Sequence, residues 1–135
     1  MSMTFDVPDY LFISLKEEEK LLHMKWLRNV VSEEYRAGIK VVKEIILHHK
    51  VELWLIDSRL IDSILFADQQ WIKREIAPLI KLSNLQRIAR VLTDDIFNYI
   101  SFENMIEEVK EEHDISLDLA QFSSLEAAFD WLRMD

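Results

Sequence analysis

Two groups of polar residues follow stretches typical of β-strands, and their side chains could carry chemistry. Asp57-Ser58-Arg59 ends the apolar run Val51–Asp57, and Thr93-Asp94-Asp95 follows the run Gln86–Leu92. Ligands of open α/β sheets bind beyond the carboxyl ends of the strands. If these two strands are neighbours, one edge of the sheet therefore gathers carboxylates, hydroxyls and a guanidinium.

Such a set could form a phosphate site, a phosphorylatable serine or an ion pair. The alternative is purely structural: Asp57 pairs with Arg59 or bonds loop backbone, while Thr93 and Asp94 cap a helix. The sequence favours this structural alternative, because polar residues prefer caps and turns whatever the function.

The remaining residue types predict neither a metal site nor a catalytic motif. The four histidines are His23, His48, His49 and His113, with no HxxxH pair among them. Gly38 is the only glycine, which excludes a P-loop, a dinucleotide fingerprint and a nucleophile elbow. The absence of cysteine excludes disulfides, iron–sulfur clusters and a thiol nucleophile. We therefore expect no enzyme, no cofactor and no metal. An enzyme would need Asp57, Asp94 and His23 clustered in a deep cleft.

Composition predicts an ordinary acidic globular domain. The 135 residues include 16 Lys+Arg and 25 Asp+Glu, a net charge of −9, which opposes binding to nucleic acid or to an anionic membrane. The N-terminus lacks a signal-peptide pattern, and the longest uncharged stretches are far shorter than the ~20 residues of a membrane span. We expect a single cytoplasmic domain over residues 1–135, with residues 1–9 as an N-terminal arm.

The first half of the sequence predicts a hairpin, a helix and a buried strand. Tyr10–Leu15 and Leu21–Leu27 flank a charged turn, as in an antiparallel hairpin. Ser32 is the expected N-cap of an amphipathic helix reaching about Lys50. Gly38 lies on its apolar stripe, where the missing side chain allows close packing. The mostly apolar run Val51–Asp57 then predicts a central strand.

The second half alternates helices and strands. Asp68 is the expected cap of a helix that kinks or ends at Pro78, and Gln86–Leu92 is the next strand. In the helix that follows, Ile96 and Ile100 are out of phase with Phe102, Met105, Ile106 and Val109, which predicts a break near Ser101. Asp114–Leu119 alternates like an edge strand, and Ser123–Glu126 is a capping box that begins the last helix.

Two of the four tryptophans are candidate contact residues. Trp71 and Trp131 lie to one side of the apolar stripes of their helices. Partial exposure of either ring would suit a partner-binding surface or a dimer contact, whereas core packing is the structural alternative. A homodimer through such a ring or through the edge strand stays open.

The order ββαβαβαβα predicts an α/β layered domain with a mixed sheet. This order, together with four short motifs, resembles the SpoIIAA-like branch of STAS domains, and most of all its small, stand-alone, largely uncharacterised bacterial members. The motifs are Trp54-Leu-Ile-Asp-Ser-Arg59, Asp68-Gln-Gln-Trp71, Arg87-Ile-Ala-Arg-Val91 and Ala127-Ala-Phe-Asp-Trp-Leu132.

The resemblance implies a non-enzymatic interaction and regulatory module related to anti-sigma factor antagonists, with a kinase-like anti-sigma factor as one candidate partner. The antagonists carry a phosphoserine in a turn that corresponds to Asp62-Ser63, but Ile64-Leu65 follows here instead of Ser or Thr and then Gly. The expected contact rim comprises Asp57, Ser58, Arg59, Asp62, Ser63, Thr93 and Asp94. The alternative is a domain that binds a lipid or small ligand in a pocket gated by Ile64-Leu65-Phe66.

Overall fold

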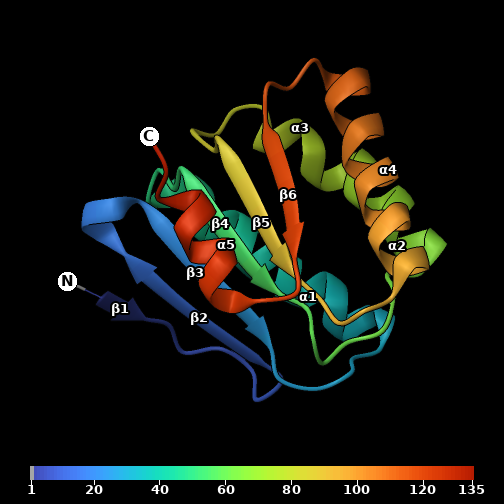
Figure 1. Ribbon diagram of the computed structural model, residues 1–135. Coiled ribbons are helices and arrows are strands. Elements are labelled where there is room, and N and C mark those ends of the chain that lie inside the picture. Colours follow the sequence, from blue (N-terminus) through green and yellow to red (C-terminus); the bar gives the residue numbers. More distant parts are fainter. Residues whose placement is uncertain (1) are drawn as a thin grey trace.

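Six strands form one mixed sheet in which every strand lies beside its neighbours in the sequence. The computed structural model describes residues 2–135 (Figure 1). The sheet order is β1-β2-β3-β4-β5-β6. The pairs β1–β2 and β2–β3 are antiparallel, and the remaining pairs are parallel. The strands are β1 (Ser2–Thr4), β2 (Leu11–Lys16), β3 (Leu21–Trp26), β4 (Leu53–Asp57), β5 (Arg87–Val91) and β6 (Asp118–Phe122).

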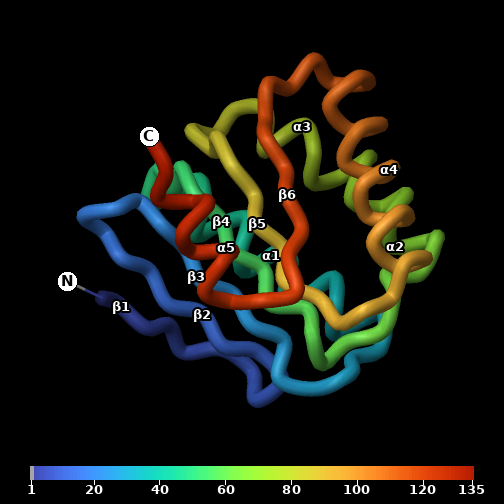
Figure 2. The backbone as a smooth tube through the Cα atoms, in the orientation of Figure 1, coloured from blue at the N-terminus to red at the C-terminus, as the bar shows by residue number. Residues whose placement is uncertain are grey.

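Helices cover the two faces of the sheet unequally (Figure 2). One face packs against α1 (Ser32–His48), α4 (Ile96–His113) and a chain of short helices, namely α2 (Phe66–Trp71), the π-helical turn η2 (Ile72–Ile76) and α3 (Ala77–Ile80). In the part of the chain that the structure describes, the helix that packs on the other face is α5 (Leu125–Leu132). From β2 onward the predicted order ββαβαβαβα is confirmed. In addition, β1 forms within the predicted arm and pairs with β2.

Strand alternation decides which core each side chain joins. Trp54, Ile56 and Ile88 join the large core under α1 and α4, while their neighbours Leu55 and Ala89 join the small core under α5. β4 lies in the interior of the sheet, as its continuous apolar run predicts. The β2–β3 hairpin is also confirmed, with the short helix η1 (Glu17–Glu19) in its charged turn.

Gly38 allows α1 to approach the sheet, as predicted. A Cβ atom at this position would lie 2.7 Å from Cη2 of Trp26. The Trp26 ring is fully buried and stacks on Tyr35 at a centroid distance of 5.2 Å. The only glycine in the chain therefore serves packing.

The predicted break in α4 near Ser101 is wrong. The helix is continuous from Ile96 to His113 and buries the face that runs from Asn98 through Phe102 to Val109, while Ile96 and Ile100 stay exposed. The two apolar stripes are out of phase because only one of them packs on the sheet. The other one points to solvent.

Several predicted helix ends and the last strand are displaced by a few residues. Asp95 caps α4 in place of Thr93 or Asp94, and Ser124 caps α5 in place of Ser123, so the predicted capping box is not formed. Val31 rather than Ser32 is the N-cap residue of α1, and its backbone N–H donates to the Glu34 carboxylate. At α4 and α5, where several polar residues are adjacent, tertiary geometry selects which one faces the free N–H groups. At α1 the Ser32 hydroxyl donates to Asp68 and so does not serve as the predicted cap.

The second helix and the edge strand are displaced in the same way. Asp68 lies inside the first turn of α2 and is buried, so it is not the predicted cap. The helix does change geometry before Pro78, through the π-helical turn η2. β6 is an edge strand, as predicted, but it begins at Asp118 because α4 extends to His113 and ends at the left-handed residue Asp114.

Candidate functional site

The loops that follow β4 and β5 lie side by side because their strands are parallel neighbours. They enclose a polar hollow, which we call the rim hollow, lined by Arg59, Leu60, Ile61, Asp62, Ser63, Thr93, Asp95 and Asn98. Four predicted rim residues are thereby brought together, namely Arg59, Asp62, Ser63 and Thr93. Asp94 lies in an adjacent hollow beside β6, and Asp57 and Ser58 are buried at the strand end.

Asp57 and Arg59 form an ion pair, which the sequence predicted as its structural alternative. Nε and Nη2 of Arg59 donate to the two carboxylate oxygens of Asp57 at 2.9 and 2.7 Å. Burial raises the pKa of Asp57, but the hydrogen bonds and charge of Arg59 outweigh it, so that this pKa lies below its ordinary value. The guanidinium is therefore already occupied by a carboxylate.

The two candidate serines differ in access. Ser58 is buried, and its backbone N–H donates to the carbonyl of Val91 at 2.8 Å. Ser63 is exposed at the rim hollow. Only Ser63 therefore has the access that a kinase requires.

The charges around the rim hollow disfavour an anion. Asp62 and Asp95 line it, and its one guanidinium, that of Arg59, is held by Asp57. A phosphate placed here would face carboxylates with no free cation among the lining residues. The phosphate-site interpretation of these residues is therefore not supported by their geometry.

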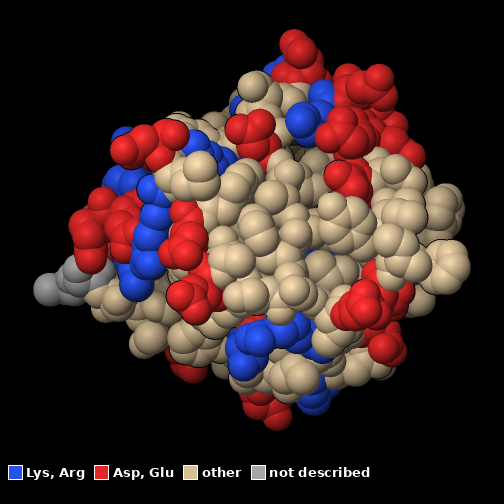
Figure 3. All heavy atoms as spheres, in the orientation of Figure 1, with Lys and Arg blue, Asp and Glu red and all other residues tan. Residues whose placement is uncertain are grey.

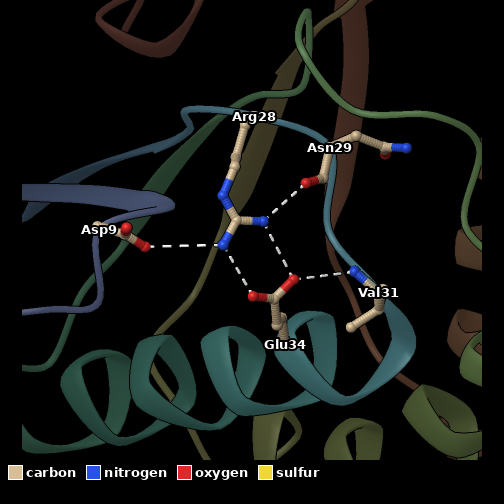
Figure 4. A network of polar contacts seen from close by, with 5 residues as sticks. All are labelled: Asp9, Arg28, Asn29, Val31 and Glu34. Atoms are coloured by element: carbon tan, nitrogen blue, oxygen red, sulfur yellow. Dashed lines mark hydrogen bonds and ion pairs between the residues drawn. The ribbon is translucent and has the colours of Figure 1, made fainter.

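The loop of residues 58–65 is held on one side by Asn29. The Asn29 side chain donates to the Asp62 carboxylate at 2.8 Å and accepts from the Asp62 backbone N–H at 3.1 Å. Asn29 is in turn positioned by Arg28, which donates to the Asn29 carbonyl at 2.9 Å and pairs with Glu34 of α1 at 2.8 Å (Figure 4). The segment before α1 thus supports the rim.

A second anchor joins this loop to α4. The side-chain amide of Gln69 donates to the carbonyl of Ile64 at 2.9 Å and to Oγ of Ser101 at 3.1 Å. Asp68, at the start of α2, accepts from Ser32 Oγ at 2.6 Å and from Nε of Arg36 at 2.8 Å. The loop and the first turn of α2 are therefore fixed to both α1 and α4.

Large apolar side chains are exposed on this anchored frame. We call them the apolar patch: Leu60, Leu65, Phe66, Ile96, Phe97 and Ile100. Phe97 is 82% exposed and Phe66 is 74% exposed. Figure 3 shows uncharged side chains protruding over α2 and the adjoining end of α4, with acidic groups on either side. In the sequence, this surface is indicated by Ile96 and Ile100, whose phase relative to Phe102 predicts a broken helix.

The two candidate tryptophans lie elsewhere. Trp71 is only 6% exposed, and the cationic groups of Arg36 and Lys40 lie 5.3 and 5.9 Å from its ring centre. The expectation that Trp71 contacts a partner is therefore not supported. Trp131 is half-buried on α5, next to Phe122 and Arg87.

The residues expected of an enzyme are not presented to a substrate together. His23 is packed edge-on between Phe12 and Phe129, and burial lowers its pKa while the charge of Asp57 opposes that shift. Asp57 is bound to Arg59, and Asp94 lies on an exposed loop. Within residues 2–135 no group of three His, Asp or Glu side chains is arranged to hold a metal ion. In the same range no helix is both long and apolar enough to cross a membrane.

One buried cation lies behind the rim. Arg90 of β5 is 1% exposed, and its guanidinium lies 4.3 Å from the ring centre of Phe102. It donates to the neutral side-chain oxygens of Asn98 at 2.8 Å and Gln121 at 3.0 Å. Burial lowers its pKa to about 10. In the sequence, Arg90 stands in the motif Arg87–Val91, a run that otherwise predicts an ordinary buried strand, and nothing near it marks it as a buried cation.

Comparisons with known proteins support the fold. No protein-family model matches this chain, and no curated protein matches it. Among solved structures it is similar to an uncharacterised protein of the DUF3478 family, with a SpoIIAA-like fold, from Shewanella loihica PV-4. The identity is 14%, the match covers 98% of this chain and 92% of that chain, and the TM-score is 0.58. The chain therefore has a SpoIIAA-like fold, as its sequence motifs suggested.

Proposed function

We propose that this chain is a non-catalytic binding domain that docks a protein partner on the apolar patch. The observation that carries the proposal is the exposure of six large apolar side chains on an anchored loop and helix end. Figure 3 shows uncharged side chains gathered over α2 and the adjoining end of α4, and exposed apolar surface of this kind is typical of an interaction site. Because hydrogen bonds to Asn29, Gln69 and Ser101 hold the frame, docking would require little ordering of the backbone.

Charge indicates the chemistry of the partner. Asp62, Asp94 and Asp95 lie beside the apolar patch, and the chain carries a net charge of −9. A complementary surface would present leucine or aromatic side chains flanked by lysine or arginine. A basic amphipathic helix of a partner protein meets both requirements.

Ser63 would make this contact adjustable. A phosphate on its exposed hydroxyl would add about two negative charges next to Asp62. The added negative charge would strengthen the attraction to a basic partner. It would also repel the Asp62 carboxylate and so loosen the loop. A kinase-like anti-sigma partner is the narrower form of this proposal, and it depends on phosphorylation of Ser63.

The test compares two single substitutions of exposed apolar residues. Phe97→Asp places a charge within the apolar patch, whereas Leu82→Asp changes an equally exposed residue, 78% exposed, in the segment between α3 and β5. Both variants and the unchanged protein are used to capture partners from the source cells by cross-linking, and the captured protein is then purified and titrated. We expect Leu82→Asp to bind like the unchanged protein and Phe97→Asp to bind at least about tenfold more weakly.

Salt dependence and thermal unfolding complete the test. The affinity should fall as salt rises, because charge complementarity contributes to the contact. Both variants should unfold at the temperature of the unchanged protein. Equal capture by all three proteins, or loss of capture with Leu82→Asp as well, would refute docking on the apolar patch.

A further inference from the structure

A small apolar cavity lies inside the large core, between the sheet and the helices on its α1 side. Its volume is about 70 Å³. Its walls include Ile56 and Ile88 from the sheet, Ile72 from η2 and Ile106 from α4, while Ile61 and Ile64 of the 58–65 loop complete the lining. Most of the lining residues are apolar, with Tyr35, Ser58 and Arg90 as the polar exceptions, so the cavity favours the hydrocarbon part of a ligand.

Two hydrogen-bond donors in the wall of this cavity are buried without an acceptor. Among residues 2–135, Nε of Arg90 and Nε1 of Trp54 find no hydrogen-bond partner, and both side chains line the cavity. Buried donors are almost always paired in folded proteins, so two orphans in one cavity wall call for an explanation. Both atoms require an acceptor, and no donor would satisfy them.

Arg90 also has no carboxylate in contact with it, although the charge of Asp95 acts on it from a distance. Within residues 2–135 no carboxylate forms an ion pair with it, and its two acceptors are the neutral amide oxygens of Asn98 and Gln121. The side chain is 1% exposed, so water does not screen the charge. Buried charges are normally paired, because an isolated charge in a low-dielectric interior is strongly unfavourable. An anion next to Arg90 would supply both the missing charge and the missing acceptor.

We propose that this cavity binds a small aliphatic monocarboxylate, with its carboxylate at Arg90 and its alkyl group among the isoleucine side chains. The cavity has about half the volume of the roughly 150 Å³ engineered cavity that holds benzene, so the ligand is a short-chain acid. Butyrate has as many non-hydrogen atoms as benzene, so it is the largest acid that we propose, and it enters only with an outward shift of the half-buried loop residue Ile64. A long fatty acid is too large for it. Inorganic phosphate or sulfate would leave most of its oxygens facing aliphatic carbon.

This proposal is independent of the docking proposal, since it uses different residues and a different class of ligand. The probe is sodium butyrate, added to the purified unmodified protein and followed by amide NMR shifts and by calorimetry. Butyramide is the matched neutral analogue, and octanoate and phosphate test the size limit and the need for an alkyl group. We expect saturable millimolar binding of butyrate, with shifts at Arg90, Trp54 and Ile106, and at least roughly tenfold weaker binding of the other three.

Two variants test the residues. Arg90→Gln removes the charge and should weaken butyrate binding at least about tenfold, as expected when a charge-assisted hydrogen bond is lost. Ile64→Phe fills the cavity from the loop, where the side chain is only half-buried, and should block butyrate while leaving Arg90 in place. If Arg90→Gln fails to fold, Ile64→Phe and the butyramide comparison still decide the question.

Three results would overturn the proposal. The first is the absence of saturable butyrate binding up to ~50 mM, which is far above the range of a functional site. The second is equal affinity for butyrate and butyramide, which would show that the charge of Arg90 plays no part. The third is shifts confined to exposed residues, which would show that butyrate binds the surface and not the cavity.

Discussion

The polar rim lies on the loops that follow β4 and β5, and the apolar patch lies beside it on the first of these loops and on the starts of α2 and α4, yet their side chains are used in opposite ways. At the rim, the charged side chains that could carry chemistry are already paired within the protein: Asp57 is bound to Arg59, and Asp62 is bound to Asn29. In the apolar patch, Phe66 and Phe97 are among the most exposed large apolar side chains of the described chain. The difference teaches that the polar groups hold this edge of the sheet in shape, and that the apolar groups are available for binding.

The largest expected effect comes from breaking the rim ion pair. Asp57→Ala leaves Arg59 without its carboxylate and should lower the free energy of unfolding by about 2 kcal/mol, somewhat below a fully buried pair because Arg59 is partly exposed. Urea denaturation measures the change. The control is Asp94→Ala, an exposed carboxylate on the neighbouring loop, which should change stability by less than about 0.5 kcal/mol. Equal effects of both variants would contradict a structural role for Asp57.

The next effect concerns the anchor of the loop. Asn29→Ala removes both hydrogen bonds to Asp62 and should lower the free energy of unfolding by about 1 kcal/mol. Hydrogen exchange of the Asp62 backbone N–H should accelerate by more than this global change explains, because the loop opens locally. Exchange that follows only global stability would show that the loop is held elsewhere.

A pH titration extends the comparison to the α5 side of the sheet, where His23 is half-buried beside aromatic rings. Burial lowers the pKa of folded His23 below its ordinary value near 6.5, so the stability that it contributes is present above that pH. As pH falls below 6.5 toward the folded pKa, this stability is lost, because only the unfolded chain readily binds the proton. Between pH 7 and 5, His23→Gln should flatten the plot of the free energy of unfolding against pH. An unchanged slope would show that other groups cause the loss of stability in this range.

The smallest effect on stability is expected in the apolar patch itself. Phe66→Ser and Phe97→Ser remove rings that contact mainly solvent, so each should change the free energy of unfolding by less than about 0.5 kcal/mol. Urea denaturation of both variants measures this directly. A loss of 2 kcal/mol or more in either variant would mean that these rings pack in solution and that the apolar patch is part of the core.

Much of the fold could be predicted from the sequence, because the spacing of apolar residues along the chain indicates which segments form helices or strands and which side they bury. The spacing of apolar residues predicts the hairpin, α1, β4 and β5. The position of Gly38 on the apolar stripe of its helix predicts its role in close packing. The ion pair of Asp57 and Arg59 could also be predicted, because the two residues are two positions apart at a strand end. Helix caps were less certain, since Thr93, Asp94 and Asp95 are chemically equivalent until the loop is folded.

The sequence by itself therefore determined the element order, the α/β class and the residues that share each face. The tertiary structure alone decided which faces are covered. The phase of Ile96 and Ile100 shows that they lie together but not whether anything packs on them, and the answer depends on where the sheet ends. Likewise, nothing local marks Arg90 as a buried cation without a carboxylate. That property depends on which side chains of α4 and β6 fold over it, because burial and charge compensation are set by distant parts of the chain.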